Sequence, residues 1–375
     1  MRHLAAAILA ACTSTSSATP PLTHTPAPTE SRKVAAPAAR PVVRLGDAAN
    51  AARVTAVQVV AAIDDAPATE KPAYARADQQ VTLYAVVTAE LSGRRTVYTD
   101  APALRLGNKQ VVTEPLAKAP LLELRWNRIE PAVNDMSNGA TPADFHFHAI
   151  DYRAVPIDDA AGKPSTPADV RPTLTLDHGN GVGTMRYQLV ALQGERVLTS
   201  AGPEARRGRG SGGLSDAVLR VSIRRDDTYL GYLTEMYNQP YIWASGGITD
   251  AQHQSEHLEG SDCADFLVYG KRRMGAKYAY TWTGGLPKIT KLLAAGTRDA
   301  AGIYRDAAGK PLPFTQAGDL VLFPRHVGAL AVDRGELGVL DDQDLMMHTL
   351  FDSPKEQAIA DSGYADKPVE LRRFR

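Results

Sequence analysis

The chain has 375 residues, of which 44% are hydrophobic and 22% are charged. This length suits two domains, and the composition supplies enough apolar side chains for folded cores, which excludes a chain that is disordered throughout. Lys and Arg together number 42, as do Asp and Glu, so the formal net charge is +0. Because nucleic-acid-binding domains normally carry a basic excess, we expect no nucleic-acid partner.

The first twelve residues indicate export. A short basic start, Met1–His3, precedes a short apolar stretch that ends at Ala11, as in signal peptides. The tetrapeptide that ends in Cys12 (LAAC) resembles the lipobox of bacterial lipoproteins, in which the cysteine is lipidated. We therefore predict a signal peptide over residues 1–12 and a membrane-anchored lipoprotein that faces the periplasm or cell envelope. The alternatives are another export signal, because the apolar stretch is short, or a cytoplasmic protein with a chance Ala-Cys pair.

Residues 13–41 are rich in Pro, Ser, Thr and Ala without apolar periodicity. This composition predicts a disordered tether. Residues 42–225 instead contain short runs in which apolar and polar residues alternate, separated by Gly, Pro, Asp and Asn. Such runs begin near Val81, Leu122, Met185 and Leu219. Period-two patterns of this kind predict an all-β, sandwich-like domain. Within it, we interpret the basic segment Arg206–Gly213 as a solvated loop.

The pattern changes to helical spacing after Arg225. Asp226–Thr228 can cap a helix that contains Leu230 and Leu233. We therefore place the domain boundary near residue 225, and predict a second domain over residues 226–375.

A lone cysteine lies at the start of a second predicted helix. Cys12 and Cys263 are the two cysteines of the chain. If Cys12 is lipidated, Cys263 has no disulfide partner, so it is either an inert buried thiol or a reactive one. Ser261 or Asp262 can cap the helix, which places Cys263 in the first turn. Unpaired N–H groups and the positive end of the helix dipole stabilise a thiolate there, so we expect a lowered pKa.

Two histidines follow on predicted strands. Residues 318–323 and 326–332 form two apolar runs joined by Pro324-Arg325, and His326 opens the second run. A histidine at a strand end can pair with a helix-N-terminal cysteine. His348 ends a further apolar run. If that strand pairs with the first, His348 can hydrogen-bond to the far nitrogen of His326 and orient it.

The order of these segments resembles the NlpC-type family of bacterial cell-wall cysteine peptidases. The matching pieces are PYIWASGG at residues 240–247, Ser261-Asp262-Cys263, the apolar run 318–323, His326-Val327-Gly328 and His348. The resemblance implies an α+β fold, with a papain-like C-terminal domain after the all-β domain. It also implies that the Tyr241 hydroxyl lies near the nucleophile, and we add Trp243, Asp262 and Asp265 as substrate-binding or supporting residues.

The chain departs from the family pattern in three places. The family usually has Ser and Gly after the cysteine, whereas Ala264 and Asp265 stand here. The stretches 248–259 and 333–344 are also longer than the usual connections. These differences do not exclude the family's chemistry, but the local hydrogen bonding must differ, and the charge of Asp265 could raise the thiol pKa or recognise a cationic group of a substrate. The family's substrate class therefore transfers less safely than its mechanism.

The implied chemistry is acyl transfer without a cofactor or metal. Cys263 attacks a peptide carbonyl of the peptidoglycan stem, His326 serves as base and then acid, and backbone N–H groups hold the oxyanion. The alternatives are an amidase, transpeptidase or acyltransferase with the same pair, or an inactive wall-binding module. Specificity depends on loops, so the sequence leaves these alternatives open.

Two histidine pairs offer weaker metal hypotheses. Asp144, His146 and His148 share one strand face, and His253 and His257 have the i, i+4 spacing of helical zinc ligands. A solvent-facing strand and a polar loop beside the cleft are the simpler interpretations. Contact of the second pair with substrate is a further possibility.

Overall fold

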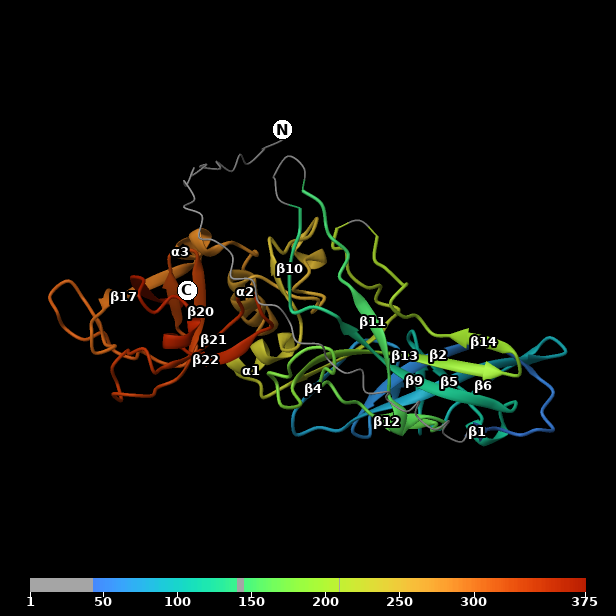
Figure 1. The fold of residues 1–375 in the computed structure, drawn as a ribbon. Helices are drawn as coiled ribbons and strands as arrows, with labels where there is room; N and C mark the ends of the chain where they lie inside the picture. The colour runs from blue at the N-terminus through green and yellow to red at the C-terminus, as the bar shows by residue number, and fades with distance from the viewer. Residues whose placement is uncertain (1–42, 140–144, 209) are drawn as a thin grey trace, which may run out of the picture.

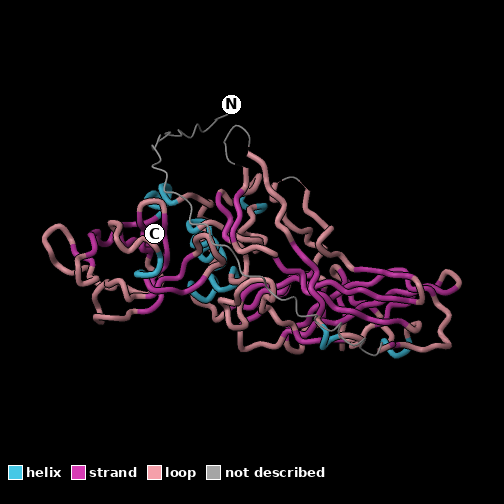
Figure 2. Tube along the Cα trace, viewed as in Figure 1, coloured by secondary structure: helices cyan, strands magenta, loops and turns pink. Residues whose placement is uncertain are grey.

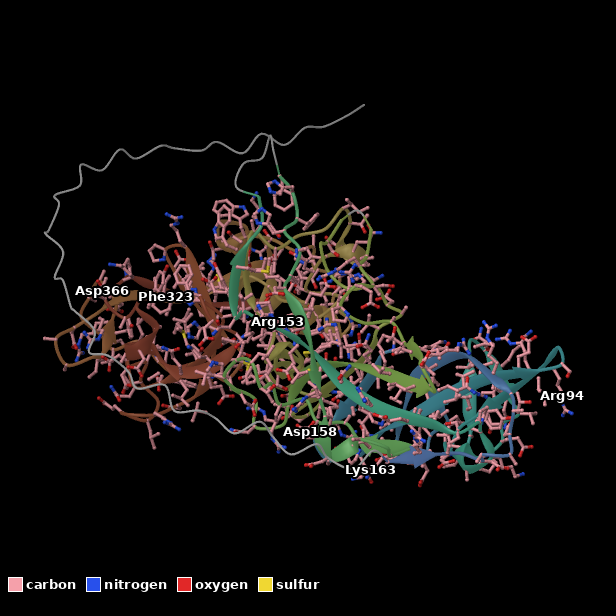
Figure 3. All side chains as sticks on the ribbon, turned by 45° about the vertical axis from the view of Figure 1, so that its right-hand side comes forward. Arg94, Arg153, Asp158, Lys163, Phe323 and Asp366 are labelled. Carbon is pink, nitrogen blue, oxygen red and sulfur yellow. The ribbon has the colours of Figure 1, made fainter. Side chains whose placement is uncertain are left out.

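The computed structural model describes residues 43–139, 145–208 and 210–375, so Cys12, Asp144 and the predicted signal peptide and tether lie outside the described residues. The ribbon shows an elongated molecule, with the strands of the first half at one end and those of the last third at the other (Figure 1). Arg94 and Asp366 mark these two ends in the side-chain view (Figure 3). None of the described helices combines the length and the apolar character needed to cross a membrane.

The first part contains two seven-stranded sheets. One has the order β1-β9-β13-β15-β4, with β11 on β9 and β14 on β13. Its strands are β1 (Arg44–Leu45), β4 (Ala73–Arg76), β9 (Leu122–Pro131), β11 (Tyr152–Pro156), β13 (Gly183–Gln193), β14 (Arg196–Thr199) and β15 (Leu219–Arg224). The other has the order β12-β5-β2-β3-β7-β8, with β6 on β5. Its strands are β2 (Arg53–Ile63), β3 (Ala68–Thr69), β5 (Val81–Leu91), β6 (Arg94–Tyr98), β7 (Leu104–Leu106), β8 (Lys109–Val111) and β12 (Ser165–Pro167). Two 3₁₀ turns, η1 (Leu116–Lys118) and η2 (Asp158–Ala160), connect strands.

Both sheets contribute to one apolar core. Leu83 from β5 and Trp126 and Leu189 from β9 and β13 are buried in it. Alternate residues of β5 are buried because successive side chains on a strand point to opposite faces. The strands predicted near Val81, Leu122, Met185 and Leu219 are therefore confirmed as local structure.

The second part is a curled seven-stranded sheet with the order β18-β17-β23-β19-β20-β21-β22. Its strands are β17 (Thr290–Arg298), β18 (Tyr304–Arg305), β19 (Leu320–Phe323), β20 (His326–Val332), β21 (Leu345–His348), β22 (Lys355–Ala358) and β23 (Val369–Phe374). The helices are α1 (Tyr229–Leu233), α2 (Cys263–Arg273) and α3 (Leu286–Ile289), with 3₁₀ turns η3 (Thr234–Met236), η4 (Asp250–Gln252), η5 (Thr283–Gly285) and η6 (Ile359–Ser362). The last strand, β23, lies between β17 and β19.

A short parallel pair joins the two parts. Strand β10 (Asp135–Ser137) extends from the first part and pairs with β16 (Tyr241–Trp243), with Met136 opposite Ile242. Tyr241 also forms a bridge with Ser261, two residues before Cys263. The first part therefore contributes backbone hydrogen bonds next to the segment that precedes the cysteine.

The fold class predicted from the sequence is wrong. The structure is 41% strand and 12% helix, with curled sheets and few helices, and is not a papain-like α+β fold preceded by an all-β domain. The tube view shows how little helix the last third holds (Figure 2). The helix predicted after Arg225 ends at Leu233. Residues 290–298, which carry no predicted element, form strand β17. Short motifs fix local structure without fixing the architecture around them.

Candidate active site

Cys263 is the first residue of α2, as its position after Asp262 predicts. The Asp262 carboxylate caps the helix by accepting hydrogen bonds from the N–H groups of Ala264 (2.9 Å) and Asp265 (2.8 Å). Asp262 therefore supports the helix start, because both hydrogen bonds satisfy N–H groups that lack a partner within the helix. Cys263 itself is 5% exposed, so its thiol is recessed.

The lowered thiol pKa expected from the helix dipole is wrong. Burial raises the pKa of the Cys263 thiol far above its ordinary value, and the neighbouring charge of Asp262 raises it further. A hydrogen bond from the backbone of Val327 acts in the opposite direction and is weaker than burial. Desolvation and the carboxylate therefore outweigh the helix end, and the resting thiol is protonated.

His326 begins strand β20 and is completely buried. Its Nε2 lies 2.9 Å from Nδ1 of His348, which is the hydrogen bond predicted from the sequence. Its Nδ1 is buried without a hydrogen-bond partner among the described residues. Burial, followed by the proximity of His348, holds the pKa of His326 well below its usual value, so the ring is neutral.

The chain of hydrogen bonds continues from His348 to Gln357 on β22. His348 Nε2 lies 3.2 Å from the Gln357 side-chain oxygen, which can only accept. Burial lowers the pKa of His348 to about 4, so its neutral ring must donate from Nε2 and accept at Nδ1. His326 then donates from Nε2, and its unpartnered Nδ1 carries the free lone pair. This order of donors and acceptors leaves Nδ1 of His326 able to accept a proton.

The backbone brings Cys263 and His326 into one neighbourhood. Helix α2 packs against strand β20, and the hydrogen bond between the Val327 backbone and the thiol places the sulfur beside the residue that follows His326. In this resting arrangement no hydrogen bond between the thiol and the His326 ring occurs in the described chain. Hydrogen bonds of this kind often form or tighten only when substrate binds, so the missing bond does not exclude the pair.

Tyr241 lies close to Cys263, and Trp243 is the last residue of the same short strand. Burial raises the pKa of the Tyr241 hydroxyl, and the adjacent Cys263 raises it further, so the hydroxyl stays protonated. The Tyr241 ring also contacts that of Phe351, with 5.5 Å between the ring centroids. Trp243, at the other end of β16, is 46% exposed. Its side chain is therefore accessible to a ligand.

Asp265 is enclosed by protein groups. Its carboxylate accepts hydrogen bonds from the Ser245 hydroxyl (2.6 Å) and the Thr281 N–H (3.2 Å), and it pairs with His253 Nε2 at 3.2 Å. The Ser245 hydroxyl in turn accepts the N–H of Asp262 at 3.1 Å. Asp265 therefore ties the loop after Trp243 to the start of α2. Sequence reasoning missed this role of Ser245, as it missed Gln357.

Three arginines from the first part hold the loop before the cysteine. Arg186 of β13 donates to the carbonyls of His257 (3.0 Å) and Leu258 (2.7 Å). Arg220 of β15 donates to the same His257 carbonyl, and Arg207 pairs with the buried Glu259. The segment Arg206–Gly213, expected to be a solvated loop, thus contains a structural contact at Arg207. These bonds fix residues 257–259, just before the segment that carries Cys263.

Neither histidine pair forms a metal site in the described chain. His146 and His148 approach each other at 2.7 Å between Nε2 atoms, while Asp144 lies outside the described residues. His253 pairs with Asp265, whereas His257 lies 3.4 Å from Asp216, so the two histidines have different partners. Across the residues that the structure describes, no three His, Cys, Asp or Glu side chains converge in a way that could hold an ion.

In comparisons with known proteins, no family model, no curated protein and no solved structure matches the chain.

Proposed function

We propose that the protein is an exported cysteine hydrolase that cleaves peptide bonds of the peptidoglycan stem, with Cys263 as nucleophile, His326 as base and His348 as the residue that orients His326. The observation that carries the proposal is the polarity of the His326–His348–Gln357 chain. It leaves one buried, unprotonated nitrogen, Nδ1 of His326, on the residue directly before Val327, whose backbone is hydrogen-bonded to the Cys263 thiol. A buried nitrogen without a partner is costly, so its retention favours a functional role.

The reaction starts from a neutral pair. Because the thiol pKa is raised and the His326 pKa is lowered, the thiol proton moves to Nδ1 of His326 as the sulfur attacks the carbonyl carbon. The protonated ring then gives this proton to the leaving amine, and a thioester forms on Cys263. Water, deprotonated by the same Nδ1, attacks the thioester and restores the thiol.

Nearby donors suit the negative charge of the tetrahedral intermediate. The N–H of Cys263 is outside the hydrogen bonds of the Asp262 cap, which go to Ala264 and Asp265. The protonated Tyr241 hydroxyl is a second donor close to the sulfur. Two preorganised donors of this kind form an oxyanion hole. The substrate class rests on the resemblance of the motifs to NlpC-type peptidases and on the export signal.

The test uses the chain without residues 1–12, incubated with peptidoglycan fragments, with products followed by mass spectrometry. We expect new stem-peptide fragments, and we expect them to vanish with Cys263→Ala. Cys263→Ala and His326→Gln are compared by circular dichroism, so that loss of activity is separated from loss of fold. If neither the parent nor any variant changes a fragment, the stem peptide is the wrong substrate. A parent and Cys263→Ala that cut equally well would rule out the cysteine as nucleophile.

A further inference from the structure

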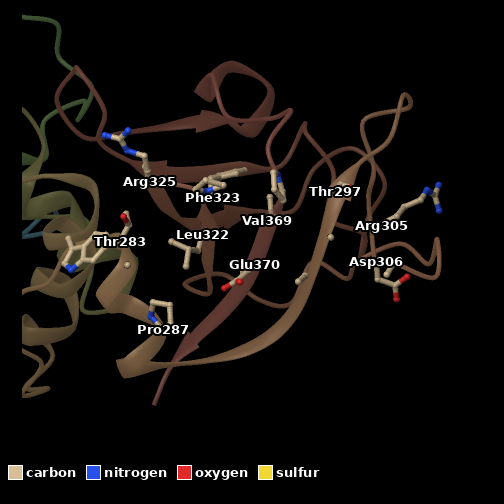
Figure 4. Close-up of a pocket in the computed structure, with 17 residues that line it drawn as sticks. Thr283, Pro287, Thr297, Arg305, Asp306, Leu322, Phe323, Arg325, Val369 and Glu370 are labelled. Carbon is tan, nitrogen blue, oxygen red and sulfur yellow. The ribbon is translucent and has the colours of Figure 1, made fainter. Parts of the chain in front are cut away.

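A pocket of about 640 Å³ lies against the C-terminal sheet (Figure 4). Strands β17, β19 and β23 supply its floor, where Ala295 and Leu322 both lie beside Glu370 in the pairing register. Pro287 stands at its side, and Trp282 also lines it. The volume falls within the range of small-molecule sites, which are typically apolar concavities with a few polar groups.

The pocket wall continues from the candidate active site along the chain. Arg325 lines the pocket and is the residue before His326. Trp282, which lines it too, follows Thr281, whose N–H is hydrogen-bonded to Asp265 near Cys263. The pocket wall is thus adjacent in sequence to His326 at one point and to the hydrogen-bond partner of Asp265 at another.

The walls are mainly apolar, and most of the charges already have partners. Glu370 pairs with Arg372 at 3.2 Å, and Arg305 pairs with Asp299 at 2.6 Å. Asp306, at the end of the pocket near Arg305, accepts N–H groups of its own turn. Arg325, at the opposite end, is exposed and has no ion pair within the described residues. A ligand that fits this pattern is apolar along its length and anionic at one end.

The backbone at Arg325 supports a role for its side chain. Arg325 has φ +69° in the two-residue turn between β19 and β20, directly after Pro324. A turn with proline first and a left-handed second residue favours glycine at the second position. A strained residue kept at such a position points to a use for its side chain.

We propose that this pocket binds an aliphatic chain that carries a carboxylate, with the chain on the floor formed by Ala295, Leu322 and Val369 and the carboxylate at Arg325. Decanoate is a probe of this class. The inference goes beyond the proposed function, because stem peptides are polar. Binding of an aliphatic carboxylate also does not require Cys263 to act as a nucleophile.

Isothermal titration of the full chain with octanoate and decanoate tests the proposal. We expect saturable binding that tightens by roughly fourfold for each added CH₂ group. The variant Ala295→Trp fills the floor from an exposed strand position and should weaken binding at least tenfold. Leu292→Trp is the matched control, because Leu292 is also exposed on β17 but lies outside the pocket. It should bind decanoate as the parent does.

The charged end has its own control. Arg325→Gln should weaken decanoate binding by roughly three- to fivefold and leave the binding of decanol unchanged, whereas Arg94→Gln, at the far end of the molecule, should alter neither. The proposal is overturned if no saturable binding occurs, or if Ala295→Trp binds decanoate as tightly as Leu292→Trp. Repeating the titration with Cys263→Ala separates this result from the hydrolase proposal: binding should persist in that variant whether or not the parent hydrolyses any peptide.

Discussion

At the scale of single residues, one amide oxygen sets the tautomers of two buried histidines. Gln357 accepts from His348, and that bond fixes His326 Nδ1 as the free base. Replacing Gln357 by Leu removes the acceptor, so His348 can turn its donor toward His326 and leave the proton on the wrong nitrogen. We expect the turnover number to fall on the order of tenfold, the worth of about one hydrogen bond. KM should change little, because Gln357 acts through the histidines.

The conservative variant provides the control. Gln357→Glu keeps an acceptor for His348 and should retain most of the activity, as steady-state kinetics on the same substrate would show. Equal loss in the Leu and Glu variants would mean that the amide serves packing and does not set the tautomers.

The charge of Asp262 acts on the thiol through space. Burial and the neighbouring Asp265 raise the pKa of Asp262 well above its ordinary value, and the charge of Asp262, once ionised, raises the pKa of Cys263. Asp262→Asn removes the charge and keeps a good N-cap, so the thiol pKa should fall. The pH profile of iodoacetamide alkylation should move to lower pH. Asp262→Ala should give the same direction of shift but also lose about 1 kcal/mol of stability with the cap. An unchanged profile in Asp262→Asn would show that burial alone sets the thiol pKa.

At the scale of elements, the antiparallel pair β20–β21 buries two neutral imidazoles. The unfolded chain protonates His348 near pH 6.5, whereas the folded chain does so near pH 4. At His348, protons therefore bind preferentially to the unfolded state within this window, and the contribution of His348 to the free energy of unfolding should fall as pH drops from 6.5 to 4. The contribution of His348 amounts to about 3 kcal/mol.

Urea unfolding at pH 7 and at pH 4.5, followed by circular dichroism, measures this dependence. His348→Gln should remove the share of this difference that His348 contributes, because the side chain no longer titrates, and should leave the opposite contribution of Asp344, whose pKa burial raises to about 7. A parent and a His348→Gln variant with the same pH dependence would contradict a depressed His348 pKa.

The elements also show which parts of the site a sequence can reveal. Helix α2 was predictable, because Asp262 is a good cap directly before an apolar, helical stretch. The β19–β20 hairpin was predictable from two apolar runs around Pro324-Arg325. Strand β22, which carries Gln357, has partly exposed residues throughout, so no alternation marks it. The thiol pKa was mispredicted because local sequence gives the helix dipole but not the burial.

The order of strands in the C-terminal sheet explains why the fold class was predicted wrongly. Strand β23 pairs with β17 and β19, partners that lie far apart in the sequence. Such pairing depends on long-range packing, so the spacing of apolar residues within a short segment does not predict it. The family resemblance supplied an architecture in its place, and that architecture is wrong.

At the scale of the whole molecule, the first part supports the segment that precedes Cys263. Arg186 is 3% exposed and binds the carbonyls of His257 and Leu258, of which Leu258 has a left-handed φ of +51°. Arg186→Met leaves these buried carbonyls with fewer partners. We expect the free energy of unfolding to fall by about 2–4 kcal/mol, and the turnover number to fall more than KM rises, because Cys263 is presented less firmly.

Arg206→Met is the matched control. Arg206 belongs to the same part of the molecule but donates to Ile150 and makes no hydrogen bond with the 257–259 loop. Denaturant unfolding and steady-state kinetics should show a smaller loss of stability and an unchanged turnover number. Equal turnover numbers in the two variants would mean that the arginine contacts do not position the nucleophile.

The place of β23 also sets an order of events during synthesis. This strand, residues 369–374, follows every other described element in the chain yet lies between β17 and β19. On the ribosome, β19 to β22 emerge first, and their edge at β19 stays open until β23 is released. The hairpins that carry His326 and His348 can form early, but the strand β17 joins their sheet only through β23. Closure of the pocket floor is therefore a late event, and an early stop within the last strand would leave β17 without its place in the sheet.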